Sequence, residues 1–184
     1  MIVHWNRIMA TVVTAGAVAA VSVGTSALAA PASRQLGLFR TWHAAQVAAG
    51  FPLIRPTKTF GLKRNGRIVV TRCVTKPTKD KHPRRLVIAR YGSTPRAQLM
   101  LSQNNTGAPC GSIGDVTSLG TVTVHGVKAK LSGLCGRAHL PPCSAKNIFL
   151  FLTWAKHHIF YVASSFGRSR GTLIAFAKGT VPVH

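Results

Sequence analysis

Two strongly apolar runs near the C-terminus predict the centre of the fold. Residues 148–154 are apolar at nearly every position, which is typical of a strand buried on both faces. Residues 158–163 form a second apolar run, and the short polar turn between the two runs predicts a hairpin. After the hairpin, Ser169 is expected to cap a helix that Lys178 and Gly179 end. The inward positions of this helix are Leu173, Ile174, Phe176 and Ala177.

The N-terminal half of the domain has weaker patterns. Helical spacing of the apolar residues over 33–49 predicts a helix that packs one face on the sheet. Two prolines in residues 51–56 allow an extended edge segment and exclude a central strand. The Asn-Gly pair at 65–66 indicates a turn, so residues 60–63 and 67–74 are expected to form a hairpin.

Four more strands follow from alternating apolar and polar positions. Residues 85–91 and 97–103 are expected to pair antiparallel, and residues 120–124 and 127–131 form a hairpin around the His-Gly pair at 125–126. Together these segments predict an α+β domain. Its mostly antiparallel sheet has about seven short strands, with one N-terminal and one C-terminal helix.

The first thirty residues have the pattern of a signal peptide. A polar start with Arg7 precedes an apolar segment over 8–23, and small residues then stand at the cleavage spacing. Cleavage is expected after Ala29 or Ala30, and an uncleaved anchor helix is the alternative. Residues 1–30 are therefore expected to direct export, and residues 31–184 to form a single secreted or extracytoplasmic domain without a transmembrane segment.

The balance of charge is unusual. The chain has 24 Lys and Arg residues, no Glu, and only Asp80 and Asp115 as acids, which gives a formal net charge of +22. Such a charge attracts polyanions without specificity and with strong dependence on salt. The alternative is that the charge only keeps an exported protein soluble.

The polar, proline-bounded residues 75–83 are expected to form an exposed loop, and this loop is the predicted electrostatic contact. Its expected partners are an anionic cell-wall polymer or a phospholipid surface, with non-specific nucleic-acid binding as a further expectation. The predicted polyanion-binding residues are Lys76, Lys79, Lys81, Arg84 and Arg85.

Four cysteines in an exported chain favour two disulfides. Three pairings are open. Cys135 with Cys143 is preferred because the loop between them could bring its ends together, and this leaves Cys73 with Cys110. A zinc site that uses His139 is the alternative, but its spacing matches no common ligand pattern.

The residues that catalysis needs are scarce. Two isolated aspartates exclude paired-carboxylate hydrolysis, and neither is placed like a metal ligand. The chain has no Gly-x-Ser-x-Gly elbow, and no free thiol is expected. We therefore expect a non-enzyme without cofactor, metal or catalytic residues, and an enzyme survives as an alternative only if a cysteine is free.

The tip of the central hairpin is a candidate binding surface. It contains Trp154, His157, His158 and Tyr161. Adjacent histidines on a strand point to opposite faces, so the pair is expected to form a turn rather than to share one metal ion. Cross-strand packing is the simpler explanation of the two aromatic residues.

Trp154 and Tyr161, with six residues between them, precede the helix positions Leu173, Ile174 and Ala177. This pattern resembles the C-terminal end of a bacterial family of extracytoplasmic domains of unknown function, found on anti-sigma-factor-like and sporulation-associated membrane proteins. The resemblance covers residues 44–178 and implies a small sheet-plus-helix domain that senses or binds outside the membrane, without catalytic residues. The family commonly has Asp or Asn followed by Gly at the hairpin tip, whereas this chain has two histidines and fewer acids. Further matching pieces are residues 48–53, Pro56-Thr57 and residues 99–103.

Composition and resemblance together predict a secreted, highly basic, non-catalytic binding or sensor-like domain of the bacterial cell envelope that associates with anionic polymers. An exported nucleic-acid-binding or toxic cationic protein is the alternative. A lytic peptide would show a basic amphipathic helix, which the sequence lacks.

Overall fold

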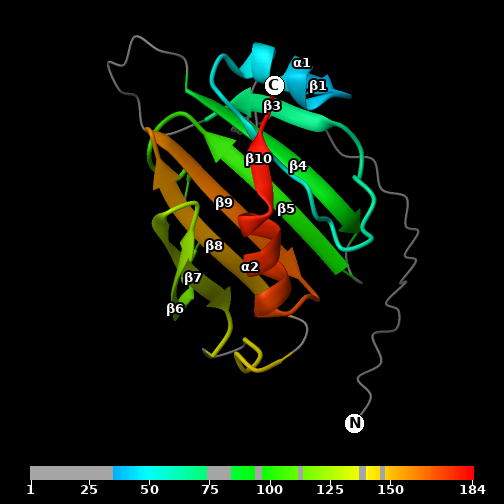
Figure 1. Cartoon of the computed structure of the whole chain (residues 1–184). Helices are drawn as coiled ribbons and strands as arrows, with labels where there is room; N and C mark the ends of the chain where they lie inside the picture. The colour runs from blue at the N-terminus through cyan, green and yellow to red at the C-terminus, as the bar shows by residue number, and fades with distance from the viewer. Residues whose placement is uncertain (1–34, 74–83, 94–96, 112–113, 137–139, 146–147) are drawn as a thin grey trace, which may run out of the picture. The chain divides into compact units, whose positions relative to one another are not determined.

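An antiparallel sheet of eight strands forms the framework of the described part of the chain. The computed structural model describes residues 35–73, 84–93, 97–111, 114–136, 140–145 and 148–184, all within one compact unit, Ser33–His184. The strand order is β1-β3-β4-β5-β9-β8-β7-β6 (Figure 1). The bounds are β1 Gln35–Phe39, β3 Ile68–Arg72, β4 Arg85–Ser93, β5 Ala97–Asn104, β6 Thr117–Val124, β7 Val127–Leu134, β8 Phe149–Lys156 and β9 Ile159–Phe166.

Two helices and a second, two-stranded sheet pack on the large sheet. Helix α1, Trp42–Ala49, contacts β1, β3 and β4, and helix α2, Arg170–Lys178, contacts β6, β8 and β9. The small sheet pairs β2, Ile54–Pro56, with β10, Thr180–Pro182, and Figure 1 shows α2 and β10 in front of the large sheet. The predicted α+β class with a mostly antiparallel sheet is confirmed. The described residues form ten strands rather than about seven.

Strand β8 is buried on one face, so the expectation of a strand buried on both faces is wrong. Leu150, Leu152 and Trp154 are buried, whereas Phe151 is half-buried and Phe149 is 39% exposed. The buried side chains of β8 belong to the same hydrophobic core as Leu173 and Phe176 of α2. Because an antiparallel sheet needs cover on only one side, its apolar side chains can alternate between core and surface.

The helix expected over residues 33–49 is wrong in its first half. Residues 35–39 form β1, which pairs antiparallel with β3. The helix begins only at Trp42, where the Thr41 side chain accepts a hydrogen bond of 3.2 Å from the Ala44 N–H. Leu36 and Leu38 also fit a period of two, and both are exposed on this edge strand.

The hairpin expected between residues 60–63 and 67–74 does not form. Strand β3 already has β1 on one side and β4 on the other, so no edge is free for a further partner. Phe60 has φ of 54°, which is incompatible with an extended strand. The segment pairs instead beside β4, where Arg64 forms an isolated antiparallel bridge with Tyr91.

Three hairpins, the cap of α2 and both disulfides agree with the sequence predictions, whereas the loop expected over residues 75–83 lies outside the described residues. Hairpins β4–β5, β6–β7 and β8–β9 form at the expected places, although β6 and β7 are longer than predicted. Ser169 caps α2, because its hydroxyl accepts a hydrogen bond of 3.1 Å from the Thr172 N–H. The structure joins Cys73 to Cys110 and Cys135 to Cys143, which is the preferred pairing. Among the described residues, no helix is long and apolar enough to cross a membrane.

One buried glutamine fastens the small sheet to the large one. Gln103 of β5 has no accessible surface, and its side chain bonds both main-chain groups of Ile54 in β2. The Ile54 N–H donates to Gln103 Oε1 at 2.8 Å, and Gln103 Nε2 donates to the Ile54 carbonyl at 2.7 Å. A side-chain amide thus replaces the strand neighbour that β2 lacks on this side.

Candidate functional site

The aromatic pair at the central hairpin is a packed unit. Trp154 and Tyr161 lie opposite each other on β8 and β9, with ring centroids 5.1 Å apart and planes inclined by 11°. They are 3% and 7% exposed, so cross-strand packing accounts for most of their surface. His157 and His158 form the turn and are both exposed, with φ of 49° and 61°. The predicted turn at the two histidines is confirmed. The stacked rings of Trp154 and Tyr161 are too buried to form an open binding platform.

Three of these four residues nevertheless line a pocket of about 250 Å³. Trp154, His157 and Tyr161 form one side of it, whereas His158 does not line it. The β6–β7 turn and the small sheet supply the other walls. The lining residues from the rest of the chain are Ile54, His125, Lys156, Thr180 and Pro182.

Hydrogen bonds hold the walls of this tip pocket together. Lys156 Nζ donates to the His125 carbonyl at 3.2 Å, which joins the end of β8 to the turn of the β6–β7 hairpin. His125 Nε2 lies 2.7 Å from Thr180 Oγ1, and the Thr180 hydroxyl donates to the Ala177 carbonyl at 2.8 Å. Because the hydroxyl proton is already used, His125 Nε2 must carry a proton and donate to Thr180.

Burial raises the pKa of Tyr161 above its ordinary value of 10.0, because the phenolate would lose hydration. The phenol therefore stays protonated at neutral pH and can donate a hydrogen bond. Lys156 adds an ammonium group at the same wall, and none of the described residues that line the pocket is acidic. The chemistry of the tip pocket is that of hydrogen-bond donors beside apolar surface.

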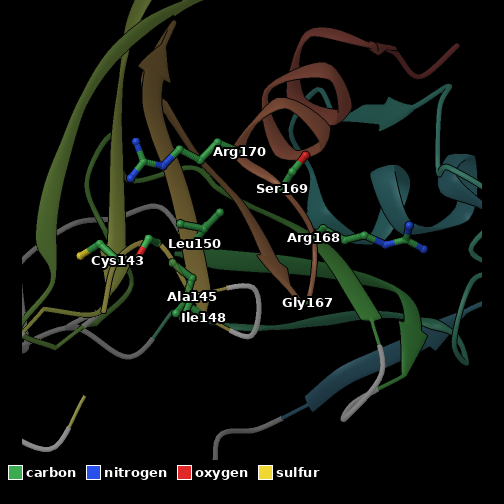
Figure 2. Close-up of a pocket in the computed structure, with 9 residues that line it drawn as sticks. Cys143, Ala145, Ile148, Leu150, Gly167, Arg168, Ser169 and Arg170 are labelled. Atoms are coloured by element: carbon green, nitrogen blue, oxygen red, sulfur yellow. The ribbon is translucent and has the colours of Figure 1, made fainter. Parts of the chain in front are cut away.

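A larger cavity, of about 510 Å³, lies at the N-terminal end of α2. It is lined by Ile148 and Leu150 at the start of β8, and by Ser169 and Arg170 at the start of α2. Figure 2 shows the Arg170 side chain reaching across the cavity near Leu150, while the Arg168 side chain extends away from it. The cavity offers apolar contact and one cation at its rim, with no catalytic arrangement.

The predicted polyanion-binding residues are placed only in part. Lys76, Lys79 and Lys81 lie outside the described residues. Arg84 and Arg85 are half-buried at the start of β4, and Arg85 Nη1 donates to the Ala48 carbonyl at the end of α1. Arg85 therefore stabilises the C-terminus of a helix, where carbonyl groups lack helical partners.

Four other cations stand on three separate segments that meet at Tyr91 or at Arg64. Arg64 Nη2 donates to the Arg40 carbonyl at 2.5 Å, and the Gly92 N–H donates to the Lys63 carbonyl at 2.8 Å. Burial raises the pKa of Tyr91, while a hydrogen bond from Trp42 and the charges of Arg64 and Arg55 oppose the shift. We call Arg40, Arg55, Lys63 and Arg64, all exposed, the basic cluster.

Metal and thiol chemistry find little support in the described residues. All four cysteines are paired, so neither a free thiol nor a cysteine ligand for zinc exists in this structure. The described part of the chain holds no group of three or more His, Cys, Asp or Glu residues placed to bind a metal. His139 of the zinc alternative lies outside the described residues.

No family model, curated protein or solved structure matches this chain. The resemblance to the extracytoplasmic family therefore stays a prediction.

Sequence patterns missed the basic cluster and most of the tip pocket. Arg40, Arg55 and Arg64 are far apart in the chain and have no shared motif. His125 was expected only as a turn residue, and Thr180 only as part of the chain's end. The long-range pairings that unite these residues have no local signal.

Proposed function

We propose that the chain is a secreted, highly basic, non-catalytic binding domain of the bacterial cell envelope that associates with anionic cell-wall polymers. The observation that supports this function most is a net charge of +22 on a chain with two acidic residues. A polyphosphate or polycarboxylate chain releases its counterions when such a surface binds it, which favours association.

The basic cluster is the contact surface in this proposal. Its cations are exposed, and Arg64 is fixed on the Arg40 carbonyl. Because this bond restrains Arg64, its side chain loses less entropy when it meets a phosphate than a free cation does. The predicted loop over residues 75–83 would add charge, but the cluster is the part whose geometry is known.

Two disulfides support the extracytoplasmic location, because such bonds persist in oxidising compartments. The predicted signal peptide gives the route. All four cysteines are paired in the two disulfides, so none supplies a free thiol to the enzyme alternative. The charge is the reason that we propose binding, and the sensor-like role that the resemblance implies is compatible with it.

The experiment compares two quadruple variants for binding to poly(glycerol phosphate) and to duplex DNA as salt rises from about 50 to 200 mM. Changing Arg40, Arg55, Lys63 and Arg64 to Gln should lower the slope of log affinity against log salt by about 3, since each phosphate contact contributes about 0.7 to 0.9. The control changes Lys128, Lys130, Arg170 and Lys178 to Gln. These exposed cations lie on β7 and α2, and their replacement removes the same amount of charge as the first variant does.

The control variant should lower the slope by less than about 1. Equal losses in both variants would contradict a contact at the basic cluster. Binding to either polymer that does not weaken with salt would contradict the proposed function itself. Tighter binding to DNA than to the wall polymer at matched charge density would favour an exported nucleic-acid-binding protein.

A further inference from the structure

The two rings of the tip pocket each have a polar atom without a protein partner. Among the described residues, neither the Trp154 indole N–H nor the Tyr161 hydroxyl has a hydrogen bond, although both side chains are more than nine-tenths buried. Fully enclosed unpaired atoms occur elsewhere, on Thr71, Arg85, Ser165 and Arg168. The two aromatic donors are therefore still reached by solvent, and both residues line the pocket.

Because solvent reaches these two donors and no described residue accepts from them, both are available to an acceptor group that enters the pocket. Lys156 adds a further donor group. Its ammonium is held at the pocket wall by the His125 carbonyl, 3.2 Å away, and two of its three N–H donors remain for another acceptor. The pocket thus offers one cation and two neutral donors to an anion.

The other walls limit what this anion can be. Ile54 and Pro182 give apolar contact, and a volume of about 250 Å³ admits only a small molecule. Phosphate groups are usually bound by arginine forks or by several main-chain N–H groups. None of the described lining residues is an arginine, and no helix begins here. A carboxylate on a short carbon body fits this set of groups better than a phosphate.

The turn of the central hairpin contributes one more residue to the pocket. His157 and His158 both have positive φ, at positions where Asn-Gly is the favoured pair in a two-residue hairpin. His, like Asn and Asp, adopts positive φ more readily than most residues, so the turn alone accounts for the conformation of the pair. His157 also lines the pocket and brings an imidazole ring to its wall.

We infer that the pocket between His125, Trp154, Lys156 and Thr180 is a binding site for a small organic carboxylate. The carboxylate accepts hydrogen bonds from the Trp154 N–H, the Tyr161 hydroxyl and the Lys156 ammonium, and its carbon body packs on Ile54 and Pro182. The site is separate from the basic cluster, so it does not depend on the proposed binding of polymers.

Nuclear magnetic resonance of the ¹⁵N-labelled protein gives a direct test. The Trp154 indole N–H resonance, assigned by its loss in Trp154→Phe, should shift saturably with lactate, benzoate or alanyl-alanine, with dissociation constants of about 1 mM or tighter. Lactate and benzoate represent free acids, and alanyl-alanine represents the carboxyl end of a peptide. The methyl esters of the same compounds, which lack the charge, should not bind.

Variants locate the site. Lys156→Gln should weaken binding at least about tenfold, and Tyr161→Phe, which removes only the hydroxyl, about fivefold. His157→Asn should weaken binding while the turn is kept, because Asn tolerates positive φ. Lys130→Gln, an equal loss of charge on β7 outside the pocket, should leave the affinity unchanged.

Three results would overturn the inference. The first is no saturable shift of the Trp154 resonance with any of the acids. The second is inorganic phosphate binding as tightly as the carboxylates, which would indicate a general anion site. The third is an equal effect of Lys130→Gln and Lys156→Gln. Saturating lactate should not change affinity for poly(glycerol phosphate), so the two proposals fail independently.

Discussion

Replacing Gln103 by Leu is expected to lower the free energy of unfolding by about 3 kcal/mol, because it leaves the N–H and the carbonyl of the half-buried Ile54 without partners. Gln103 has no accessible surface and bonds both the N–H and the carbonyl of Ile54. The neighbouring groups of β2 are turned toward β10 and the end of the chain. Val183 N–H donates to the Leu53 carbonyl, and Thr57 N–H donates to the Gly179 carbonyl, each at 2.9 Å.

Urea denaturation of the variant checks this result, with Gln98→Leu as the matched control. Gln98 lies on the same strand but is half-buried on the other face, so its replacement should change stability by less than about 1 kcal/mol. A loss below about 1 kcal/mol in Gln103→Leu would show that apolar packing alone holds the small sheet in place.

Removing the Cys73–Cys110 disulfide is expected to destabilise the protein by about 4 kcal/mol, and removing Cys135–Cys143 by about 2.5 kcal/mol. The difference follows from the sequence separations of 37 and 8 residues, because a longer closed loop restricts the unfolded chain more. Each pair would be replaced by two alanines and the stability measured by urea denaturation.

Cys135 has no accessible surface, so its replacement by alanine also removes packing contacts, a cost that chain entropy does not include. The reverse order of stabilities would therefore contradict the entropic account. It would show that packing around Cys135 outweighs the length of the loop.

Sequence patterns predicted the local structure correctly where each pattern fitted only one kind of element. The two apolar runs around His157-His158, and Ser169 before α2, gave the central hairpin and the last helix correctly. The same logic failed at residues 35–39, because five residues with Leu36 and Leu38 fit both a period of two and a period of 3.6. Residues 35–39 form a strand because they pair with the edge of β3. A single sequence does not show which strand edge is free for such pairing.

The candidate sites were less predictable than the fold. Trp154, His157 and Tyr161 were found because they stand close together in the chain. His125 and Thr180 complete the tip pocket only because β6–β7 and β10 meet the central hairpin in space. Arg85 was expected to bind polyanions, whereas its guanidinium bonds the end of α1. The composition gives the net charge, but the positions of the basic residues in space depend on how the strands and helices are arranged.

The most direct measurement of the proposed function is retention of the purified protein by isolated bacterial cell walls. Walls that keep their anionic polymers are compared with the same walls after acid extraction of those polymers, at about 0.15 M salt. The proposal predicts strong retention on intact walls, release by high salt, and loss of most retention after extraction. Equal retention on intact and extracted walls would contradict it, because the protein would then recognise the wall without its anionic polymers.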